Sequence, residues 1–567
     1  MMFSRICAAA KVSAALTVAT VVCAPGASIT VQKDEPEQQV VGFGAGAVYY
    51  QGWVTALGET TRQAFYDTAF TGLNLSLLRM GNWAQDLSEE TSANVISADD
   101  VAIVKAAKDR QGDKLKIEMS SWSAPANLKP SNSLEGSAAG GDESKATLKT
   151  SSTDPYGKFV YKEFASWWKQ SYLAYRAAGI PIDYISLQNE PDMFADYHET
   201  LFEPTESDKV AGYAQALNAV YDSLKSIKDP PKILGPEPLG IGYSNFQKYM
   251  QALDASKLDG YAYHLYHSGS GKKAWDDYVN PEVFRSPMTS IMTQYLSATK
   301  PIIMTEFCSM AENGKEEYMT GLAHIIQVGF TSGGIAGYIA WELFWGEGKG
   351  QLIGVCTKGW GECTKDTIVI SPEYHAMRHY SKFVNPGWYV VPALVSDADN
   401  LYAVAFRNEN DKDSVTVVVI NEGSSAVSLD APKIQYNQVQ LVGMTEEKWA
   451  PITVVQSVEN GDKSKVIATA DTYSLPAKSI TTFVYKNENS SAISLAAGTR
   501  VLGVSISDRT LMVGTSATVQ LFDMQGRPVY QAQGVSGTVS LANLATGSYI
   551  LRVKDGNSWK VQRIQLR

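Results

Sequence analysis

Two glutamates in this chain stand close to the ends of short apolar segments. Residues 182–187 are followed by Gln188, Asn189 and Glu190, and "PIIMT" is followed by Glu306. Polar groups at the end of a buried strand must be satisfied by each other or by something bound there. Two facing carboxylates could cleave a glycosidic bond, one as nucleophile and one as acid and then base. Asn189 is a candidate donor to a sugar hydroxyl or to the other carboxylate.

Between about residues 40 and 385, apolar β-branched segments alternate with amphipathic ones such as "ADDVAIVKAAKDR". This pattern predicts an α/β fold, a (β/α)8 TIM barrel. We expect its strands over residues 41–48, 73–80, 115–121, 182–188, 232–234, 260–265, 301–305 and 335–340. An open, doubly wound sheet is the alternative that strand counting leaves open. In a barrel, Glu190 would end strand four and Glu306 strand seven, both at the face where barrel enzymes carry their active sites.

Further candidate substrate-binding residues lie at or just beyond the predicted strand ends. Aromatic faces stack on sugar rings, and a tyrosine hydroxyl near a nucleophile can orient it. For each candidate, the alternative is ordinary packing at the barrel rim, and a histidine there could be a satisfied core residue. The candidates are Trp122, His264, Tyr266, Trp341, Arg79, Trp83 and Trp345, with Trp360 as a further possibility.

Changes in composition and in the apolar pattern divide the chain into segments. We expect a signal peptide at 1–27, the catalytic barrel at 28–385, a side β-sandwich at 386–486, a Ser/Ala-rich linker at 487–500 and a small all-β domain at 501–567. The segment 1–27 has basic residues near its start, an apolar run and small residues at its end, as signal peptides do. A long polar insertion at 131–154 is expected to be a lid or a binding loop.

The net charge limits the kinds of molecule that the protein would bind, and the cysteines indicate which covalent and metal sites to expect. The 567 residues carry a formal net charge of −10, which disfavours nucleic acid or an anionic membrane and favours a neutral polymer. Cys356 and Cys363 bracket "TKGWGE" and are predicted to form a disulfide, leaving Cys308 as a free buried thiol. No cysteine or histidine spacing indicates a metal, and we expect no cofactor. No later segment approaches the length of a membrane span, and we expect a monomer.

Five segments in order, "GFGAGA", "LSLLRM", "SSWSAPANLK", "SLQNEPD" and "MTEF", resemble glycoside hydrolase family 30 of clan A. The resemblance covers roughly residues 40–485. It implies a TIM barrel fused to a side β-sandwich, with Glu190 as acid/base and Glu306 as nucleophile of a retaining enzyme. A non-catalytic carbohydrate-binding surface protein is the alternative of another class. It would be expected to have lost one carboxylate, and both are present.

The segment "HAMRHYSKFVNPGW" is most similar to the xylanase branch of that family, which implies plant cell-wall xylan as substrate, cleaved within the β-1,4-linked chain. Members that require a glucuronic acid branch hold its carboxylate with an arginine after strand eight. Residues 342–371 contain Lys349, Lys358 and Lys365 but no arginine. We therefore expect activity on unbranched or differently decorated xylan, including arabinoxylan as well as glucuronoxylan. β-1,6-Glucanase and glucosylceramidase branches remain alternatives.

The last segment contains "GSYILRV" and a basic end at Arg563 and Arg567. It resembles the C-terminal sorting domains of exported or surface-attached bacterial enzymes that degrade polysaccharides. The resemblance implies that export machinery is a partner and that the protein is secreted or attached to the cell surface. A small carbohydrate-binding or spacer module is the alternative.

Overall fold

The computed structural model describes residues 26–85, 87, 95–269, 280–308, 318–346, 350–409, 413–435, 449–487, 504–507, 509–523, 527–555 and 558–566. The predicted linker, apart from its first residue, and nearly all of the predicted signal peptide lie outside these residues. The chain divides into two compact units, Met1–Asn487 and Glu488–Arg567.

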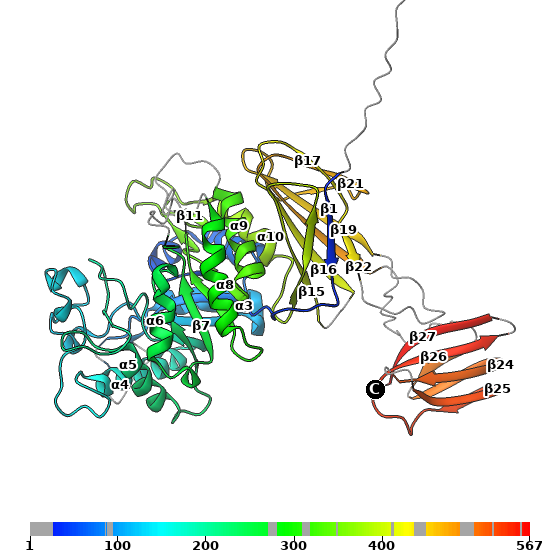
Figure 1. Cartoon of the computed structure of the whole chain (residues 1–567), viewed down its shortest axis with the longest axis horizontal. Helices are drawn as coiled ribbons and strands as arrows, with labels where there is room; N and C mark the ends of the chain where they lie inside the picture. Colours follow the sequence, from blue (N-terminus) through cyan, green and yellow to red (C-terminus); the bar gives the residue numbers. More distant parts are fainter. Residues whose placement is uncertain are drawn as a thin grey trace, which may run out of the picture. The chain divides into compact units, whose positions relative to one another are not determined.

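Eight parallel strands close into a barrel, which confirms the predicted TIM barrel and excludes the open sheet (Figure 1). Strand β9 pairs with β2 and closes the ring, with Gly42 opposite Gly337. The strands are β2 (Gly42–Gly46), β3 (Leu77–Gly81), β4 (Lys116–Ser120), β5 (Ile182–Ser186), β6 (Lys232–Pro236), β7 (Gly260–His264), β8 (Ile302–Glu306) and β9 (Ile335–Ala340).

Helices surround the barrel and bury the outer face of its strands, which is why the strands read as apolar runs rather than as alternating ones. These helices are α1 (Gln51–Thr55), α2 (Glu59–Tyr66), α3 (Ala98–Gln111), α4 (Tyr161–Ala177), α5 (Tyr213–Leu224), α6 (Asn245–Ala252), α8 (Arg285–Tyr295), α9 (Tyr318–Ser332) and α10 (Pro372–Ser381). The largest difference from the predicted strand bounds is at the start of β3. Strand β3 begins at Leu77 rather than residue 73, because α2 continues into a further helical segment, Asp67–Gly72.

The first barrel strand is built from small residues because its neighbour approaches closely. A Cβ atom added to Gly44 would lie 2.5 Å from Cβ of Leu77 on β3, closer than carbon atoms pack. Glycine at this position therefore lets β2 and β3 pair inside the closed barrel.

The side sandwich contains a six-stranded sheet in the order β13-β15-β16-β22-β19-β20, with smaller sheets β14-β1-β18 and β17-β21. Its strands are β1 (Ser28–Gln32), β13 (Tyr389–Val391), β14 (Ala393–Ser396), β15 (Leu401–Arg407), β16 (Ser414–Asn421), β17 (Val427–Asp430), β18 (Lys433–Gln435), β19 (Trp449–Val458), β20 (Lys465–Ile467), β21 (Thr472–Leu475) and β22 (Ser479–Asn487).

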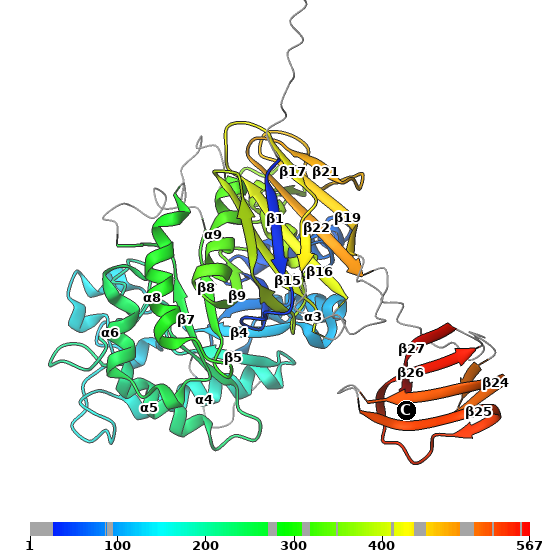
Figure 2. The same cartoon turned by 45° about the vertical axis from the view of Figure 1, so that its right-hand side comes forward.

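Strand β1 corrects the sequence-based boundary, which assigned residues from 28 onward to the barrel. It runs antiparallel to β14 and parallel to β18, and in both views it lies among the strands of the sandwich (Figure 1, Figure 2). Ile29 and Val31 are buried in the same core as Val417 and Val419 of the larger sheet. The N-terminal strand thus belongs to the sandwich because its alternate side chains fill the sandwich core.

Helices α9 and α10 join the barrel to the six-stranded sheet. His379 on α10 is fully buried, with Nδ1 2.8 Å from Oγ1 of Thr482 and Nε2 2.8 Å from Oγ of Ser457. On α9, Nε2 of Gln327 donates to the carbonyl of Ala403 at 2.9 Å. These polar contacts fix the sandwich against one side of the barrel.

The C-terminal unit is all-β, with the order β23-β24-β26-β27 and β25 paired to β24. Its strands are β23 (Val504–Ser507), β24 (Thr510–Phe522), β25 (Pro528–Ser540), β26 (Gly547–Asp555) and β27 (Ser558–Leu566). Leu511, Val519, Leu521 and Leu551 belong to a hydrophobic core of its own. Within the part of the chain that the structure describes, no helix is long and apolar enough to cross a membrane.

Candidate active site

The two glutamates identified by sequence meet at the carboxyl ends of the barrel strands. Glu306 is the last residue of β8, and Glu190 lies four residues beyond the end of β5. Their exposed fractions are 6% and 5%. A carboxylate oxygen of each and a ring nitrogen of His264 all lie within 4.8 Å of one another. The barrel therefore brings together the pair that sequence spacing predicted.

Glu190 occupies a tight turn formed by the Asn-Glu-Pro segment. Its φ of 47° is left-handed, and its backbone N–H donates to the carbonyl of Glu237 at 3.1 Å. Oε1 lies 2.8 Å from Nδ1 of His264, and Oε2 accepts from the Tyr197 hydroxyl at 3.3 Å. Burial raises the pKa of Glu190 to about 7, which His264 opposes and the charge of Glu306 reinforces. A carboxyl group with this pKa can both give and take a proton near neutrality.

Glu306 is held by two donors from different strands. The Tyr266 hydroxyl, just beyond β7, donates to Oε1 at 2.9 Å. The guanidinium of Arg79, on β3, donates to Oε2. These two contacts fix the orientation of the Glu306 carboxylate toward the mouth of the barrel.

Arg79 was predicted to contact substrate, but the structure places it beneath the carboxylates, with no exposed surface. Its Nη2 donates to Oδ1 of Asn189 at 2.8 Å and to Oε1 of Glu237 at 3.1 Å. Its Nε lies 3.1 Å from Oε2 of Glu118. Burial alone would lower the pKa of Arg79, but the surrounding glutamates raise it instead. Arg79 is thus a positioning residue for Asn189 and Glu306.

Sequence reasoning missed Glu118 and Glu237, two fully buried carboxyl groups around Arg79. Burial raises the pKa of Glu118 to about 8, and the neighbouring Glu237 adds to this. Burial acts in the same direction on Glu237, but Arg79 and His264 overcome it and hold the Glu237 pKa at about 2. Glu237 directly follows the apolar strand β6, the same signal that identified Glu190 and Glu306. Glu118 lies inside β4 and has no such signal.

His264 ends β7 and is fully buried between the carboxyl groups. Its Nδ1 lies 4.0 Å from Oε2 of Glu306, and its Nε2 lies 3.5 Å from Oε1 of Glu237. Burial acts to lower the pKa of His264, but the three nearby glutamates raise it to about 10. The imidazole is therefore positively charged at neutral pH. A metal ion would have to displace this proton before His264 could coordinate it, and in the protonated state the cluster Glu190, His264 and Glu306 is suited to proton transfer.

The chain is similar to known proteins over most of its length. The chain is 23% identical over 486 residues to glucuronoxylanase XynC of Bacillus subtilis, covering 83% of this chain and 93% of that protein. The solved structure of Xyn30A, a family 30 subfamily 8 xylanase from Clostridium acetobutylicum, is similar with a TM-score of 0.57 and 22% identity, covering 81% of this chain and 99% of that one. The chain therefore shares the fold of this family 30 xylanase, and for that similarity we call the unit that holds the barrel and the sandwich the family 30 unit.

A second solved structure shows that this fold serves more than one substrate. The endo-β-1,6-glucanase BT3312 matches the family 30 unit with a TM-score of 0.56 and 18% identity, over 81% of this chain and 94% of that one.

The C-terminal unit matches a different protein family. Residues 498–567 match the family model of the secretion system C-terminal sorting domain. This match confirms the expectation that the protein is secreted or attached to the cell surface.

Predicted aromatic residues of the family 30 unit gather beside the carboxylates. Trp122 is 5.9 Å from Trp341 and 5.7 Å from Trp83 between ring centroids. Tyr49, which sequence reasoning did not single out, contacts all three of these rings at 5.1 to 6.0 Å. Trp345 lies further along and stacks on Tyr50 at 5.6 Å. The tryptophans therefore pack on one another, and the Trp122 ring lies 4.7 Å from the Arg79 guanidinium that donates to Glu306.

The insertion at 131–154 is tied to the wall of the site. The N–H of Gly136 donates to the carbonyl of Tyr197 at 2.7 Å, and that of Ser137 donates to Asp196 at 3.0 Å. This wall carries Tyr197, the donor to Glu190, and His198, whose ring lies 5.4 Å from that of Trp83. The insertion thus supports the loop that completes the Glu190 environment. Tyr197 had no local sequence signal, because only the fold brings it to Glu190.

After β9, a small sheet is formed by β10 (Phe344–Trp345), β11 (Ile353–Cys356) and β12 (Thr367–Ile370). A disulfide joins Cys356 to Cys363 across the turn between β11 and β12, with their Cα atoms 5.5 Å apart. Cys308 is buried and remains a thiol, with its Sγ 3.9 Å from the Tyr266 hydroxyl. Lys349, one of the three lysines noted in this region, lies outside the described residues.

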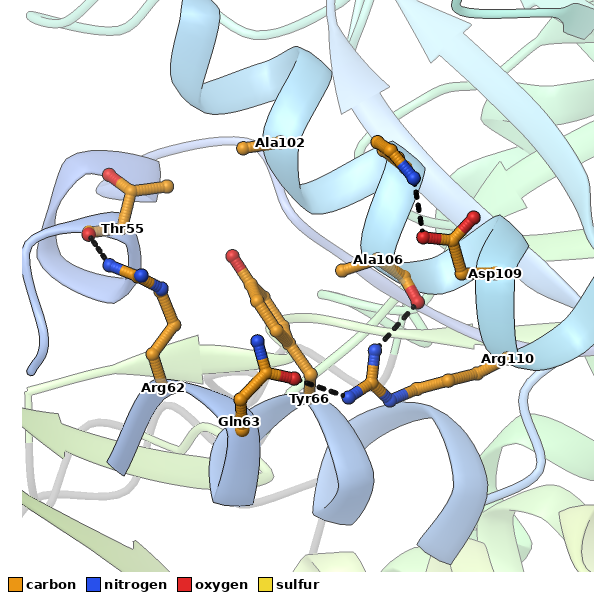
Figure 3. A pocket seen from close by; sticks show the side chains of 9 residues that line it. Thr55, Arg62, Gln63, Tyr66, Ala102, Ala106, Asp109 and Arg110 are labelled. Atoms are coloured by element: carbon orange, nitrogen blue, oxygen red, sulfur yellow. Dashed lines mark hydrogen bonds and ion pairs between the residues drawn. The ribbon is translucent and has the colours of Figure 1, made fainter. Parts of the chain in front are cut away.

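A cavity of about 450 Å³ opens elsewhere, between α2 and α3 (Figure 3). The basic groups that line it already have partners. Arg62 donates to the carbonyl of Thr55, Arg110 to Oε1 of Gln63, and Lys105 to Asp109. Neither Glu190 nor Glu306 lines this cavity, so it is separate from the carboxylate pair.

Proposed function

We propose that the family 30 unit is a retaining glycoside hydrolase that cleaves β-1,4-xylan within the chain. The main support for this proposal is that carboxylate oxygens of Glu190 and Glu306 lie within 4.8 Å of each other. Retaining enzymes place these groups about 5 to 5.5 Å apart, whereas inverting enzymes need about 6.5 to 9.5 Å for an intervening water.

The environments of the two groups support distinct roles. Glu306, oriented by Tyr266 and Arg79, attacks the anomeric carbon and forms a glycosyl-enzyme ester. Glu190, whose pKa burial raises to about 7, gives its proton to the leaving oxygen. The charged His264 then stabilises the Glu190 carboxylate that remains. In the second step Glu190 takes a proton from water, and this water releases the sugar from Glu306.

The choice of xylan depends on the relatives and on the sequence after β9. XynC and Xyn30A are named as xylanases. The segment 342–371 contains no arginine, and a bidentate arginine is the usual partner for a uronate carboxylate. We therefore propose cleavage of both glucuronoxylan and arabinoxylan, without dependence on a glucuronic acid branch.

The product profile of the purified protein tests this proposal. We expect oligosaccharides from glucuronoxylan and from linear arabinoxylan, and none from β-1,6-glucan, when products are read by mass spectrometry. Cleavage only beside glucuronate would contradict the proposed independence from that branch. Products from β-1,6-glucan alone would contradict xylan as the substrate and would indicate β-1,6-glucan instead. Absence of any product would favour the carbohydrate-binding alternative.

Substitution of the two glutamates tests their roles. Glu306→Gln should abolish turnover on every substrate, whereas Glu190→Gln should retain activity on aryl glycosides whose leaving groups need no proton. Glu163→Gln, on the exposed face of α4, is the matched control and should behave as the wild type. Retention of the anomeric configuration in the first product, observed by NMR, is expected. Wild-type polymer activity in either active-site variant would refute that residue's assignment.

We further propose that the chain acts as a monomer and that export machinery recognises its C-terminal sorting domain. A chain truncated after Asn487 should stay inside the cell while retaining activity in the lysate. Export of the truncated chain at the wild-type level would refute the sorting role. Elution as a larger species than one chain would refute the monomer.

A further inference from the structure

Aromatic rings continue outward from the active site along the loops that follow β2 and β9. Successive ring centroids lie 5.9 to 6.0 Å apart, from Trp341 to Tyr49, then to Tyr50, Trp53 and Trp360. Trp345 stacks on Tyr50 as a side branch. We call the outer members, Tyr50, Trp53, Trp345 and Trp360, the aromatic row.

Exposure differs along this series, and Trp53, between Tyr50 and Trp360, is partly buried. Trp341, beside the carboxylates, is 9% exposed, whereas Tyr50 and Trp360 are 40% and 38% exposed. Large aromatic side chains left open next to one another commonly mark a binding surface. The outer part of the series therefore offers two accessible rings, Tyr50 and Trp360, on either side of the partly buried Trp53.

The turn that carries Trp360 is held by a disulfide and by a backbone hydrogen bond. The Cys356–Cys363 disulfide closes it, and Gly359 and Gly361 on either side of Trp360 have left-handed φ values of 84° and 54°. The Trp360 N–H donates to the carbonyl of Thr357 at 2.9 Å. A closed turn of this kind holds its tryptophan in place before any ligand arrives, which lowers the entropy cost of binding.

The same turn is attached to the elements that follow β2. Oγ1 of Thr357 donates to the carbonyl of Trp53 at 2.5 Å. Asp366 accepts from the N–H of Gly58 at 2.8 Å and from that of Lys358 at 2.7 Å. A Cβ atom on Gly52 would lie 3.3 Å from Cη2 of Trp360, so glycine allows the indole to lie against α1. The position of Trp360 relative to Tyr50 is thus set by several independent contacts.

We propose that the aromatic row is a distal binding surface for further sugar residues of the polysaccharide chain that occupies the Glu190–Glu306 centre. Sugar rings present apolar faces that stack on aromatic rings, and the row is continuous with the rings that border the catalytic pair. Lys358 and Glu362 flank Trp360 with opposite charges, which suits a neutral chain. This inference rests on the proposed function, because it assigns additional subsites to the same substrate.

Chain-length dependence tests the surface in the full-length protein. The ratio of kcat/KM for a xylohexaose to that for an aryl xylobioside should fall about 3- to 10-fold in Trp360→Ala, the loss expected for one stacking contact. Trp360→Phe should recover part of this ratio, because it keeps an aromatic face. Ile452→Ala, which removes an exposed apolar side chain of the side sandwich, is the control and should leave the ratio unchanged. An unchanged ratio in Trp360→Ala would overturn the inference.

Binding separates this inference from the proposed function. In the inactive Glu306→Gln background, added Trp360→Ala should weaken retention on immobilised xylan, measured by affinity electrophoresis, and so should Cys356→Ser with Cys363→Ser. Equal retention with and without Trp360 would overturn the distal surface while leaving the hydrolase intact. If the wild type cleaves β-1,6-glucan instead of xylan, the same two measurements with that glucan and its oligosaccharides decide the inference by the same criteria.

Discussion

Nδ1 of His264 lies 2.8 Å from Oε1 of Glu190, while Nε2 of the same ring faces Glu237 at 3.5 Å. The imidazole is therefore held between a carboxyl group that titrates near neutrality and one whose pKa is about 2. Glu306, Glu190 and the ionised Glu237 together keep a positive charge on His264. That charge in turn limits how far burial raises the pKa of Glu190.

The pH profile of the enzyme should report Glu190. The proton donor is present below its pKa of about 7 and is lost as the pH rises through that value, so kcat/KM on xylan should fall on the alkaline side of about pH 7. Replacement of His264 by Gln removes the opposing charge, so the alkaline limb should move upward by about one unit. A limb that moves downward in His264→Gln, measured between pH 5 and 9, would contradict this account.

Tyr266 should affect the chemical step more than substrate binding. Its hydroxyl donates to Glu306 at 2.9 Å, so Tyr266→Phe leaves the nucleophile with one donor fewer. We expect kcat to fall about 10- to 100-fold, as for loss of a hydrogen bond to a charged group, with little change in KM. An increase in KM with unchanged kcat would instead indicate that Tyr266 only binds sugar.

Arg79→Lys tests whether one guanidinium organises the base of the site. An ammonium group cannot reproduce the separate contacts that Nε, Nη1 and Nη2 make with Glu118, Glu306 and Asn189. We expect kcat to fall by about 100-fold or more, and the melting temperature to fall because buried carboxylates lose a partner. Wild-type kcat in this variant would contradict a positioning role.

The joint between barrel and sandwich should lose stability in acid. Burial lowers the pKa of His379 to about 3, well below its ordinary value. In the unfolded chain the histidine at position 379 is protonated near pH 6.5, whereas in the folded chain it is protonated only near pH 3. The free energy of unfolding therefore falls as the pH drops through this range. At pH 5 the loss is about 2 kcal/mol. In His379→Asn the difference in unfolding free energy between pH 7 and pH 5 should shrink by that amount, and an unchanged difference would contradict the assignment.

Glu190 and Glu306 could be located from the sequence because each stands close to the end of an apolar segment, and parallel strands in a barrel all end at one face. The same reasoning applied to Glu237, after "KILGP", would have found a third carboxylate. Glu118 and Tyr197 could not be found in this way. Glu118 points inward from the middle of a strand, and Tyr197 reaches Glu190 only through the loop supported by the 131–154 insertion.

Strand β1 illustrates a second limit. Its alternating pattern identifies a half-buried strand, but its partners β14 and β18 begin more than 360 residues later. Local pattern carries no information on which sheet such a strand joins. The sequence therefore predicted eight barrel strands correctly while assigning β1 to the wrong domain.

Because β1 and β22 both belong to the sandwich, the first and last strands of the family 30 unit lie outside the barrel. The chain leaves this unit from β22, which is hydrogen-bonded along its length to β16 on one side and β19 on the other. When the protein is held by its C-terminal end while its substrate is pulled by flow, the tension enters at β22. That tension meets the hydrogen bonds that join β22 to β16 and to β19 before it reaches the barrel strands.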